Sequence, residues 1–113
     1  MWAAIERATG RLIGHGGLQH LEQTGAVELG YYLGRAAWGK GYATELGRAA
    51  LDYGFSRLRL PEVVAVVRHD NHASQRVLTK LGFRYSHDAH HYGFDVRYWR
   101  LPAADHRPRP GTR

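Results

Sequence analysis

The sequence predicts a single α/β domain in which two helices pack on a mixed β-sheet. Extended segments rich in β-branched and aromatic residues alternate with two stretches whose apolar residues have helical spacing. The chain has 113 residues and is 43% apolar, which suits one hydrophobic core. The expected order is β-β-β-loop-α-β-α-β-β, without an internal repeat or a linker.

The first half of the chain predicts three strands. Residues 3–7 and 12–18 are two extended segments around a tight turn, in which Gly10 can take a positive φ. A second polar turn occupies residues 22–25. Residues 27–34 then alternate β-branched or aromatic residues with small or polar ones, a pattern typical of a strand.

A helix is expected to begin near Tyr42, after a glycine-containing loop, and to end before Pro61, which cannot continue a helix. Its apolar residues form two adjacent stripes: Leu46, Ala50 and Tyr53, and Leu51, Phe55 and Leu58. The β-branched run at residues 63–67 predicts a strand that is covered on both faces.

The second predicted helix has a cap at each end. Asn71 can cap its start, and Gly82 suits the left-handed position that closes it. Val77, Leu78 and Leu81 supply its apolar face. An extended run restarts after Gly82, and residues 92–101 alternate like a strand.

The charge of the chain says little about its partners. The net charge is +6, but residues 106–113 carry three arginines and no acid, and the other basic residues are dispersed. We therefore expect a folded core at residues 1–101 and a disordered basic tail at residues 102–113. Clustered basic residues interleaved with exposed aromatics would indicate a nucleic-acid-binding domain, and they are missing, so no nucleic-acid partner is expected.

Several classes of protein are disfavoured by composition. The chain has no cysteine, so it has no disulfides or thiolate metal sites, which fits an intracellular protein. No apolar run approaches the roughly 20 residues that cross a bilayer, and the first residues do not form a signal peptide. The expected setting is a cytoplasmic enzyme that has no membrane partner.

The loop at residues 38–44 has the features of an anion site. It connects a strand to a helix, and the first turn of a helix has backbone N–H groups without intrahelical partners. Gly39 and Gly41 let a phosphate approach those groups without a Cβ in the way. Lys40 adds a positive charge and Thr44 a hydroxyl donor. An ordinary loop with glycines for tight packing is the alternative interpretation.

Two known phosphate motifs do not fit this loop. The dinucleotide fingerprint needs a third glycine and an acidic residue about 20 residues later. The P-loop needs Ser or Thr directly after Gly-Lys, whereas Gly41 follows Lys40. The sequence thus supports neither a nicotinamide nor a nucleoside triphosphate site.

Three segments in order, residues 28–33, 38–45 and 71–83, closely resemble the GNAT superfamily of N-acetyltransferases. The resemblance covers roughly residues 2–101. It is strongest to the group that acetylates protein N-termini, including those of ribosomal proteins. It implies a mixed, mostly antiparallel sheet that is splayed at the cofactor strand and has two helices packed on it.

The same resemblance implies acetyl-CoA as the co-substrate. The loop at 38–44 would wrap the pyrophosphate with its amides, and the strand at 27–33 would pair with the pantetheine arm, as in strand addition. The amide of Leu33 would serve as an oxyanion donor. The implied cofactor-binding residues are Tyr31, Tyr32, Leu33, Trp38, Gly39, Lys40, Gly41, Tyr42, Ala43, Thr44, Asn71 and Ser74.

Glu28 and Ser74 are the candidate catalytic side chains. By resemblance, Glu28 is a general base near the thioester, although a solvent-facing strand glutamate is the alternative interpretation. Ser74 can protonate the leaving thiolate or orient the pantetheine, or simply serve the first turn of its helix. Asn71 can cap that helix, contact the cofactor, or do both. The tyrosine that many relatives use as general acid falls on Leu78, so that proton donor is absent.

A protein N-terminal α-amine is the expected acceptor. An α-amine with a pKa of about 7.8 costs about 1 kcal/mol to deprotonate at pH 7, against about 4.6 kcal/mol for a lysine with a pKa of about 10.4. Correct positioning can supply most of the remaining rate of a direct attack through a tetrahedral intermediate. The alternatives are a small-amine acetyltransferase, acting on an aminoglycoside or polyamine, and a non-catalytic CoA-binding remnant.

The chain is N-terminally short relative to the family. Relatives carry a first strand and helices that help to form the acceptor site, and this sequence starts after them. A misassigned start, a longer parent chain or a partner that supplies the missing wall would each account for this. A sheet edge left open gives the chain a reason to pair, so a homodimer is possible.

The histidines do not predict a metal site. His87, His90 and His91 cluster near a predicted hairpin, but without cysteine or a helical i, i+4 pair we expect exposed turn residues. His69 and His72 flank Asn71 near the expected cofactor cleft and are interpreted as part of a polar loop.

Overall fold

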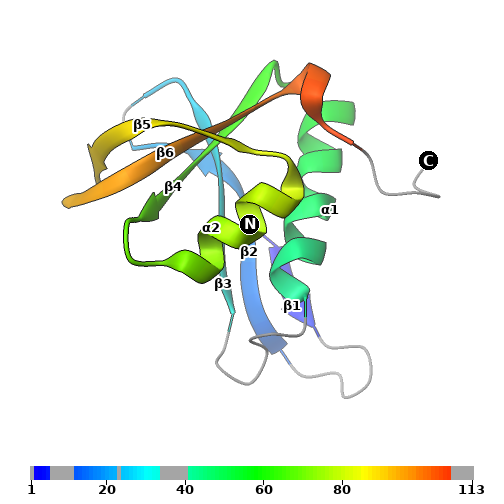
Figure 1. Cartoon of the computed structure of the whole chain (residues 1–113). Helices are drawn as coiled ribbons and strands as arrows, with labels where there is room; N and C mark the ends of the chain where they lie inside the picture. Colours follow the sequence, from blue (N-terminus) through cyan, green and yellow to red (C-terminus); the bar gives the residue numbers. More distant parts are fainter. Residues whose placement is uncertain (1, 6–11, 23, 34–40, 108–113) are drawn as a thin grey trace.

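The computed structural model describes residues 2–5, 12–22, 24–33 and 41–107 (Figure 1). Three strands come first, followed by two helix–strand units and a final strand. Their bounds are β1 Trp2–Ile5, β2 Leu12–His20, β3 Val27–Leu33, α1 Tyr42–Ser56, β4 Glu62–Arg68, α2 His72–Leu81, β5 Arg84–His91 and β6 Phe94–Pro102. A short 3₁₀ turn at Ala103–Asp105 follows. The predicted order of elements is confirmed.

The described strands form one six-stranded sheet in the order β1-β2-β3-β4-β6-β5. Neighbouring strands are antiparallel except for β3 and β4, which run parallel. The expected mixed, mostly antiparallel sheet with two helices packed on it is therefore confirmed. Parallel strands need a crossover connection, and α1 lies in the segment that joins β3 to β4.

The parallel pair is joined at one position only. Glu28 of β3 lies opposite Val64 of β4, and no further register pair links the two strands. By contrast, β3 pairs with β2 along its whole length, from Val27 to Leu33. The carboxyl half of β3 therefore presents an edge that β4 does not cover, which is the splay that the resemblance implied.

Both helices pack on one face of the sheet, where the core lies. Helix α1 contacts β2, β3 and β4, and α2 contacts α1 and β4. Gly47 and Gly54 allow α1 to come close, because a Cβ there would lie 2.6 Å from Leu81 Cδ1 and 2.7 Å from Leu18 Cδ1, respectively. The core consists of Leu29, Ala50, Leu51, Val63, Ala65, Leu78, Leu81, Phe83, Trp99 and Leu101.

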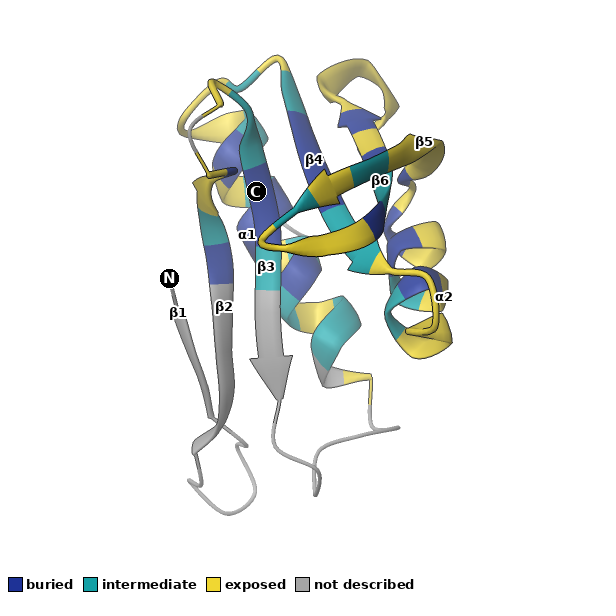
Figure 2. Cartoon of the chain, turned by 90° about the vertical axis from the view of Figure 1, so that its left-hand side faces the viewer, coloured by how far each residue is buried: buried dark blue, intermediate teal, exposed yellow. Residues whose placement is uncertain are grey.

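The predicted apolar stripes of α1 are only partly confirmed. Ala50 and Leu51 are buried, but Tyr53 is 43% exposed and Leu58 is 49% exposed. The helix ends at Ser56, so Leu58 lies in the following turn and no longer follows the helical spacing. In contrast, β4 is buried at its centre, where Val63, Val64 and Ala65 are all covered (Figure 2).

The segment after residue 101 differs from the expected disordered tail in its first part. Strand β6 continues to Pro102, and the 3₁₀ turn brings His106 back onto α1. His106 Nε2 lies 2.7 Å from Asp52 Oδ1, and the imidazole packs against Phe55 with ring centroids 5.0 Å apart. Residues 102–107 thus belong to the folded part, while residues 108–113 lie outside the described residues.

A tight hairpin joins β5 to β6. His91 pairs with Phe94, and the two residues between them have positive φ, 55° at Tyr92 and 80° at Gly93. Positive φ at both central residues defines a type I′ turn, whose twist matches that of the flanking strands. The hairpin curls over the sheet and crosses β3 on the face opposite α1 (Figure 2).

Replacing Leu78 by Ala should destabilise the domain by about 2–5 kcal/mol, because the side chain is 1% exposed and packs in the core. Leu58→Ala is the matched control, since that leucine is 49% exposed; we expect a change within about 0.5 kcal/mol. Chemical denaturation measures both free energies of unfolding. Equal losses would contradict the assigned core.

Candidate functional site

Among the described residues, the start of the first helix differs from that of the second. Gly41 occupies the N-cap position with φ 76°, and no side chain of the described residues caps it. Helix α2 differs, because Asn71 Oδ1 accepts a hydrogen bond from the Ser74 amide at 3.1 Å. A helix start without a side-chain cap from the described residues has amide donors and a positive end that suit an anion.

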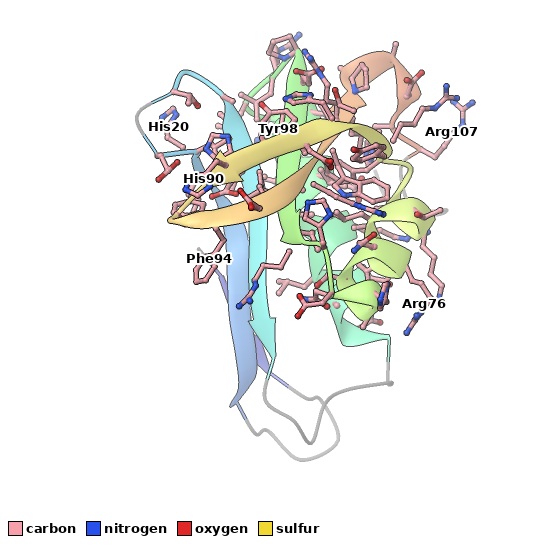
Figure 3. All side chains as sticks on the ribbon, turned by 60° about the vertical axis from the view of Figure 1, so that its left-hand side comes forward. His20, Arg76, His90, Phe94, Tyr98 and Arg107 are labelled. Atoms are coloured by element: carbon pink, nitrogen blue, oxygen red, sulfur yellow. The ribbon has the colours of Figure 1, made fainter. Side chains whose placement is uncertain are left out.

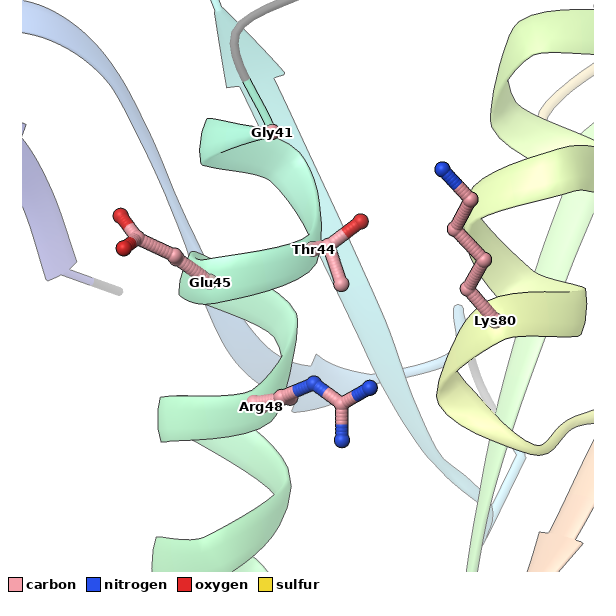
Figure 4. Close-up of a pocket in the computed structure, with 5 residues that line it drawn as sticks. All are labelled: Gly41, Thr44, Glu45, Arg48 and Lys80. Atoms are coloured by element: carbon pink, nitrogen blue, oxygen red, sulfur yellow. The ribbon is translucent and has the colours of Figure 1, made fainter. Parts of the chain in front are cut away.

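An open pocket of about 420 Å³ lies beside this helix start. Its lining residues are Gly41, Thr44, Glu45, Arg48 and Lys80 (Figure 4). Thr44, Arg48 and Lys80 point into the space between α1 and α2, whereas Glu45 points to the other side of α1. The pocket therefore combines a hydroxyl donor and two cationic side chains with the helix start.

Arg48 and Lys80 were not among the residues expected from the sequence. A signal for Arg48 was available, because residues four apart share one helix face and Arg48 follows Thr44 by four. Lys80 lies on the other helix, so only the packing of α2 against α1 reveals its position.

Some of the expected cofactor residues lie outside the part of the chain that the structure describes. Trp38, Gly39 and Lys40 lie outside the described residues. Tyr42 begins α1, and Ala43 and Thr44 follow in its first turn, both half-buried. Tyr31, Tyr32 and Leu33 form the carboxyl end of β3, and their backbones pair with β2; their side chains are not described.

The start of α2 is placed by a set of polar contacts. Gln75 is 8% exposed, and its side-chain amide donates to the carbonyls of His69 at 3.1 Å and Arg68 at 3.3 Å. Arg97 Nη1 of β6 donates to Gln75 Oε1 at 2.9 Å. These bonds tie the β4–α2 connection to the sheet, so Asn71 and Ser74 have defined positions after β4. Of the two roles open to Asn71, the cap is confirmed.

Glu28 is buried, contrary to the solvent-facing alternative. It is 4% exposed, and Gln19 Nε2 donates to its Oε1 at 2.9 Å. The Tyr92 hydroxyl donates to the same oxygen. Leu29 points into the core below α1, and successive strand residues alternate, so Glu28 projects from the opposite face. The buried carboxyl group of Glu28 thus lies at the point where β3 pairs with β4.

The start of α1 and the basic pocket lie on the side of the sheet where β3 and β4 end, whereas Glu28 is the second residue of β3. In α/β sheets, ligands bind outside the carboxyl ends of strands where neighbouring connections diverge. Here β3 leads to α1 and β4 leads to α2, and the uncapped start of α1 lies beside the basic pocket. Among known protein families, a model described as Acetyltransferase (GNAT) domain matches residues 1–84.

The chain belongs to the GNAT acetyltransferase family. Among curated proteins, it is 37% identical over 106 residues to "Uncharacterized protein YkkB" of Bacillus subtilis, covering 92% of this chain and 58% of that protein. It is 38% identical over 84 residues to "Uncharacterized N-acetyltransferase p20" of Bacillus licheniformis, covering 74% and 47%, respectively. This GNAT chain therefore spans about half the length of these relatives.

Solved structures share the fold. A GNAT-family acetyltransferase from Bacillus anthracis has a TM-score of 0.79 at 26% identity, covering 90% of this chain and 65% of that one. The ribosomal-protein-S5-alanine acetyltransferase from Vibrio fischeri has a TM-score of 0.80 at 22% identity, with coverages of 94% and 62%. A spermidine N-acetyltransferase SpeG chimera from Vibrio cholerae and hSSAT has a TM-score of 0.73 at 24% identity, covering 88% of this chain and 64% of that one.

The tip of the β5–β6 hairpin, residues 91–94, is anchored by acidic residues of the GNAT chain. Glu22, in the turn after β2, accepts the Tyr92 amide at 3.0 Å and contacts His91 Nδ1 at 2.7 Å. The hydrogen bond with His91, then that from the Tyr92 amide, lowers the pKa of Glu22. Burial, then the contact with Glu28, raises the pKa of Tyr92, so its phenol keeps its proton at neutral pH.

Other histidines of the hairpin contact a carboxylate or an aromatic ring. His90 Nδ1 lies 3.0 Å from Asp95 Oδ1, and His87 stacks on Tyr98 with ring centroids 4.6 Å apart. The His91 side chain is only 16% exposed, so the expectation of an exposed turn residue is wrong for it. No group of three metal-ligating side chains occurs in the described ranges.

Within the part of the chain that the structure describes, neither helix has the length and apolarity that would let it span a bilayer.

Acid should loosen the tip of the hairpin before the core. The pKa of Glu22 lies below its ordinary 4.5 in the folded state, so its stabilising contribution is present above that value and is lost as pH falls through the folded pKa. The protection factor of the Tyr92 amide should therefore fall in that range, measured by hydrogen exchange.

The Leu101 amide, in the core strand β6, is the internal control and should stay protected. In Glu22→Gln, the protection of Tyr92 should be weak and independent of pH. A pH-independent Tyr92 amide in the unsubstituted chain would contradict the assigned anchor.

Proposed function

We propose that the chain is the cofactor-binding and catalytic core of an N-acetyltransferase that moves an acetyl group from acetyl-CoA to a primary amine. The observation that carries this proposal is the uncapped start of α1, which faces Arg48 and Lys80 at the split between β3 and β4. This combination suits a diphosphate joined to an extended arm.

The described residues fit acetyl-CoA at the start of α1. A Cβ built on Gly41 meets nothing within 4 Å, so the space in front of the helix start is open. The amides of residues 42–44 would hold the pyrophosphate together with Trp38, Gly39, Lys40 and the Thr44 hydroxyl, while Arg48 and Lys80 add charge. The uncovered edge of β3, which contains Tyr31, Tyr32 and Leu33, would pair with the pantetheine arm.

Acetyl-CoA supplies a thioester carbonyl as the electrophile. Glu28 would take the proton of the amine, and both of its hydrogen bonds from described residues end on Oε1, which leaves Oε2 for that proton. The Leu33 amide would stabilise negative charge on the carbonyl oxygen. Ser74, with Asn71 beside it, would orient the pantetheine or protonate the leaving sulfur. The tyrosine that many relatives use as general acid falls on Leu78, which is buried in the core and has no acidic proton.

A protein N-terminal α-amine is the acceptor that we favour. Its deprotonation costs about 1 kcal/mol at pH 7, so one carboxylate suffices as base. The structural similarity to an alanine acetyltransferase of ribosomal protein S5 agrees with this choice. The similarity to a spermidine N-acetyltransferase favours a small amine as the second candidate. A homodimer would supply a further wall for the acceptor.

Gly41→Glu should abolish acetyl-CoA binding, because it places bulk and negative charge at the helix start. Any side chain is strained at φ 76°, so the matched control is Gly41→Lys, which has similar bulk and strain but positive charge. We expect the Lys variant to bind about 10-fold or more tightly than the Glu variant. Isothermal titration calorimetry measures both affinities, and equal affinities would contradict the site.

Glu28→Gln should lower kcat about 100-fold while the affinity for acetyl-CoA stays unchanged, since it removes a base and not a cofactor contact. Mass spectrometry with acetyl-CoA, a panel of peptide N-termini and a panel of polyamines identifies the acceptor. Acetylation of the peptides supports an N-terminal acetyltransferase, and acetylation of polyamines alone supports the second candidate. Cofactor binding without any product would indicate a non-catalytic remnant.

A further inference from the structure

We propose that Tyr92, at the tip of the β5–β6 hairpin, is a positioning residue for Glu28 and fixes which carboxylate oxygen receives the proton of the amine. This inference rests on the proposed function, because it assigns a partner to the proposed base. It concerns a residue that neither the sequence motifs nor the pocket beside α1 identified.

The backbone of Tyr92 is held in an unfavourable conformation. Its φ is 55°, in the left-handed region that costs a non-glycine residue free energy. Asn is the preferred residue at the first central position of a type I′ turn when Gly occupies the second. A tyrosine at this position therefore needs a reason other than turn formation, and its side chain supplies one by reaching Glu28.

The contact spans the sheet. Tyr92 comes 64 residues after Glu28 and donates its phenolic proton to Glu28 Oε1. The hairpin is held over β3 by Glu22, which accepts the Tyr92 amide at 3.0 Å and pairs with His91 at 2.7 Å. On its other side, Phe94 lies under the guanidinium of Arg68 at the end of β4, 4.5 Å from the ring centroid. The hairpin tip is thus attached to β3 through Glu28 and to the end of β4 through Arg68.

The hydrogen bonds to Glu28 distinguish its two carboxylate oxygens. Gln19 and Tyr92 both donate to Oε1, so that oxygen's acceptor capacity is used within the protein. The phenol, which keeps its proton, fixes the orientation of the Glu28 carboxyl group through Oε1, and it leaves Oε2 to accept the proton of an incoming amine. Gln19 is neutral, so among the described residues Tyr92 is the titratable group in direct contact with Glu28, and Glu22 and His91 are the titratable groups next to Tyr92.

Three variants separate positioning from a structural role. Tyr92→Phe removes the hydroxyl alone. Tyr92→Asn also removes it but supplies the Asn-Gly pair that this turn favours, so the hairpin should be retained. Tyr85→Phe is the matched control, because Tyr85 is 47% exposed and its hydroxyl donates to another carboxylate, Asp88 Oδ1, at 2.6 Å.

The experiment records the carboxyl ¹³C resonance of Glu28 in the full chain at neutral pH and measures kcat with the amine acceptor. In Tyr92→Phe and Tyr92→Asn, this resonance should move from its position in the unsubstituted chain, since a hydrogen-bond donor to Oε1 is lost. The value of kcat should fall about 10-fold, with an unchanged KM for acetyl-CoA. Tyr85→Phe should change neither quantity.

An unchanged Glu28 carboxyl resonance in both Tyr92 variants would overturn the proposal, whatever the activity. So would normal kcat in Tyr92→Asn together with a loss in Tyr92→Phe, since that result would indicate a turn effect. If Glu28→Gln keeps full activity while the Glu28 resonance still moves in the Tyr92 variants, the contact stands and the role of Glu28 in the proposed function fails. The two failures are thus distinguishable.

Discussion

The incomplete pairing of β3 with β4 is the constraint on which the rest of the structure depends. The two strands run parallel and meet in register only at Glu28 and Val64. A parallel pair requires a crossover, and α1 provides it, which places the start of the helix beside the strand end that it follows. An edge of β3 that β4 does not cover and a helix start without a side-chain cap from the described residues therefore flank the same connection. Strand edges and helix starts are places where a ligand can satisfy backbone groups.

The two faces of the sheet serve different purposes. The face under α1 and α2 holds the core, and close helix packing at Gly47 and Gly54 seals it. The other face carries Glu28, covered by the β5–β6 hairpin (Figure 3 shows Phe94 and His90 on this hairpin). A cofactor arm at the split would therefore reach from the basic pocket between the helices toward a carboxylate on the opposite face. In the proposed function, the sheet would separate phosphate binding from proton transfer.

The order of elements and part of the site were predictable from the sequence, because they depend on local signals. Asn71 as a cap and Gly82 as a helix end follow from side-chain and backbone preferences that act over a few residues. The contacts of Glu28 with Tyr92 and of Asp52 with His106 were not predictable. They join residues far apart in the chain, and no periodicity or motif encodes which hairpin tip reaches which strand. The place of Lys80 in the pocket was not predictable for the same reason, since Arg48, which lines the same pocket, lies on another helix.

The central claim is that the amides opening α1 and the uncovered edge of β3 bind one acetyl-CoA molecule. Amide chemical-shift mapping of the ¹⁵N-labelled chain during a titration with acetyl-CoA tests it most directly. The account predicts the largest, saturable shifts at residues 41–44 and 29–33, with side-chain shifts at Arg48 and small changes at the 3₁₀ turn, residues 103–105. Saturable shifts confined to other surfaces, or none at millimolar acetyl-CoA, would contradict it.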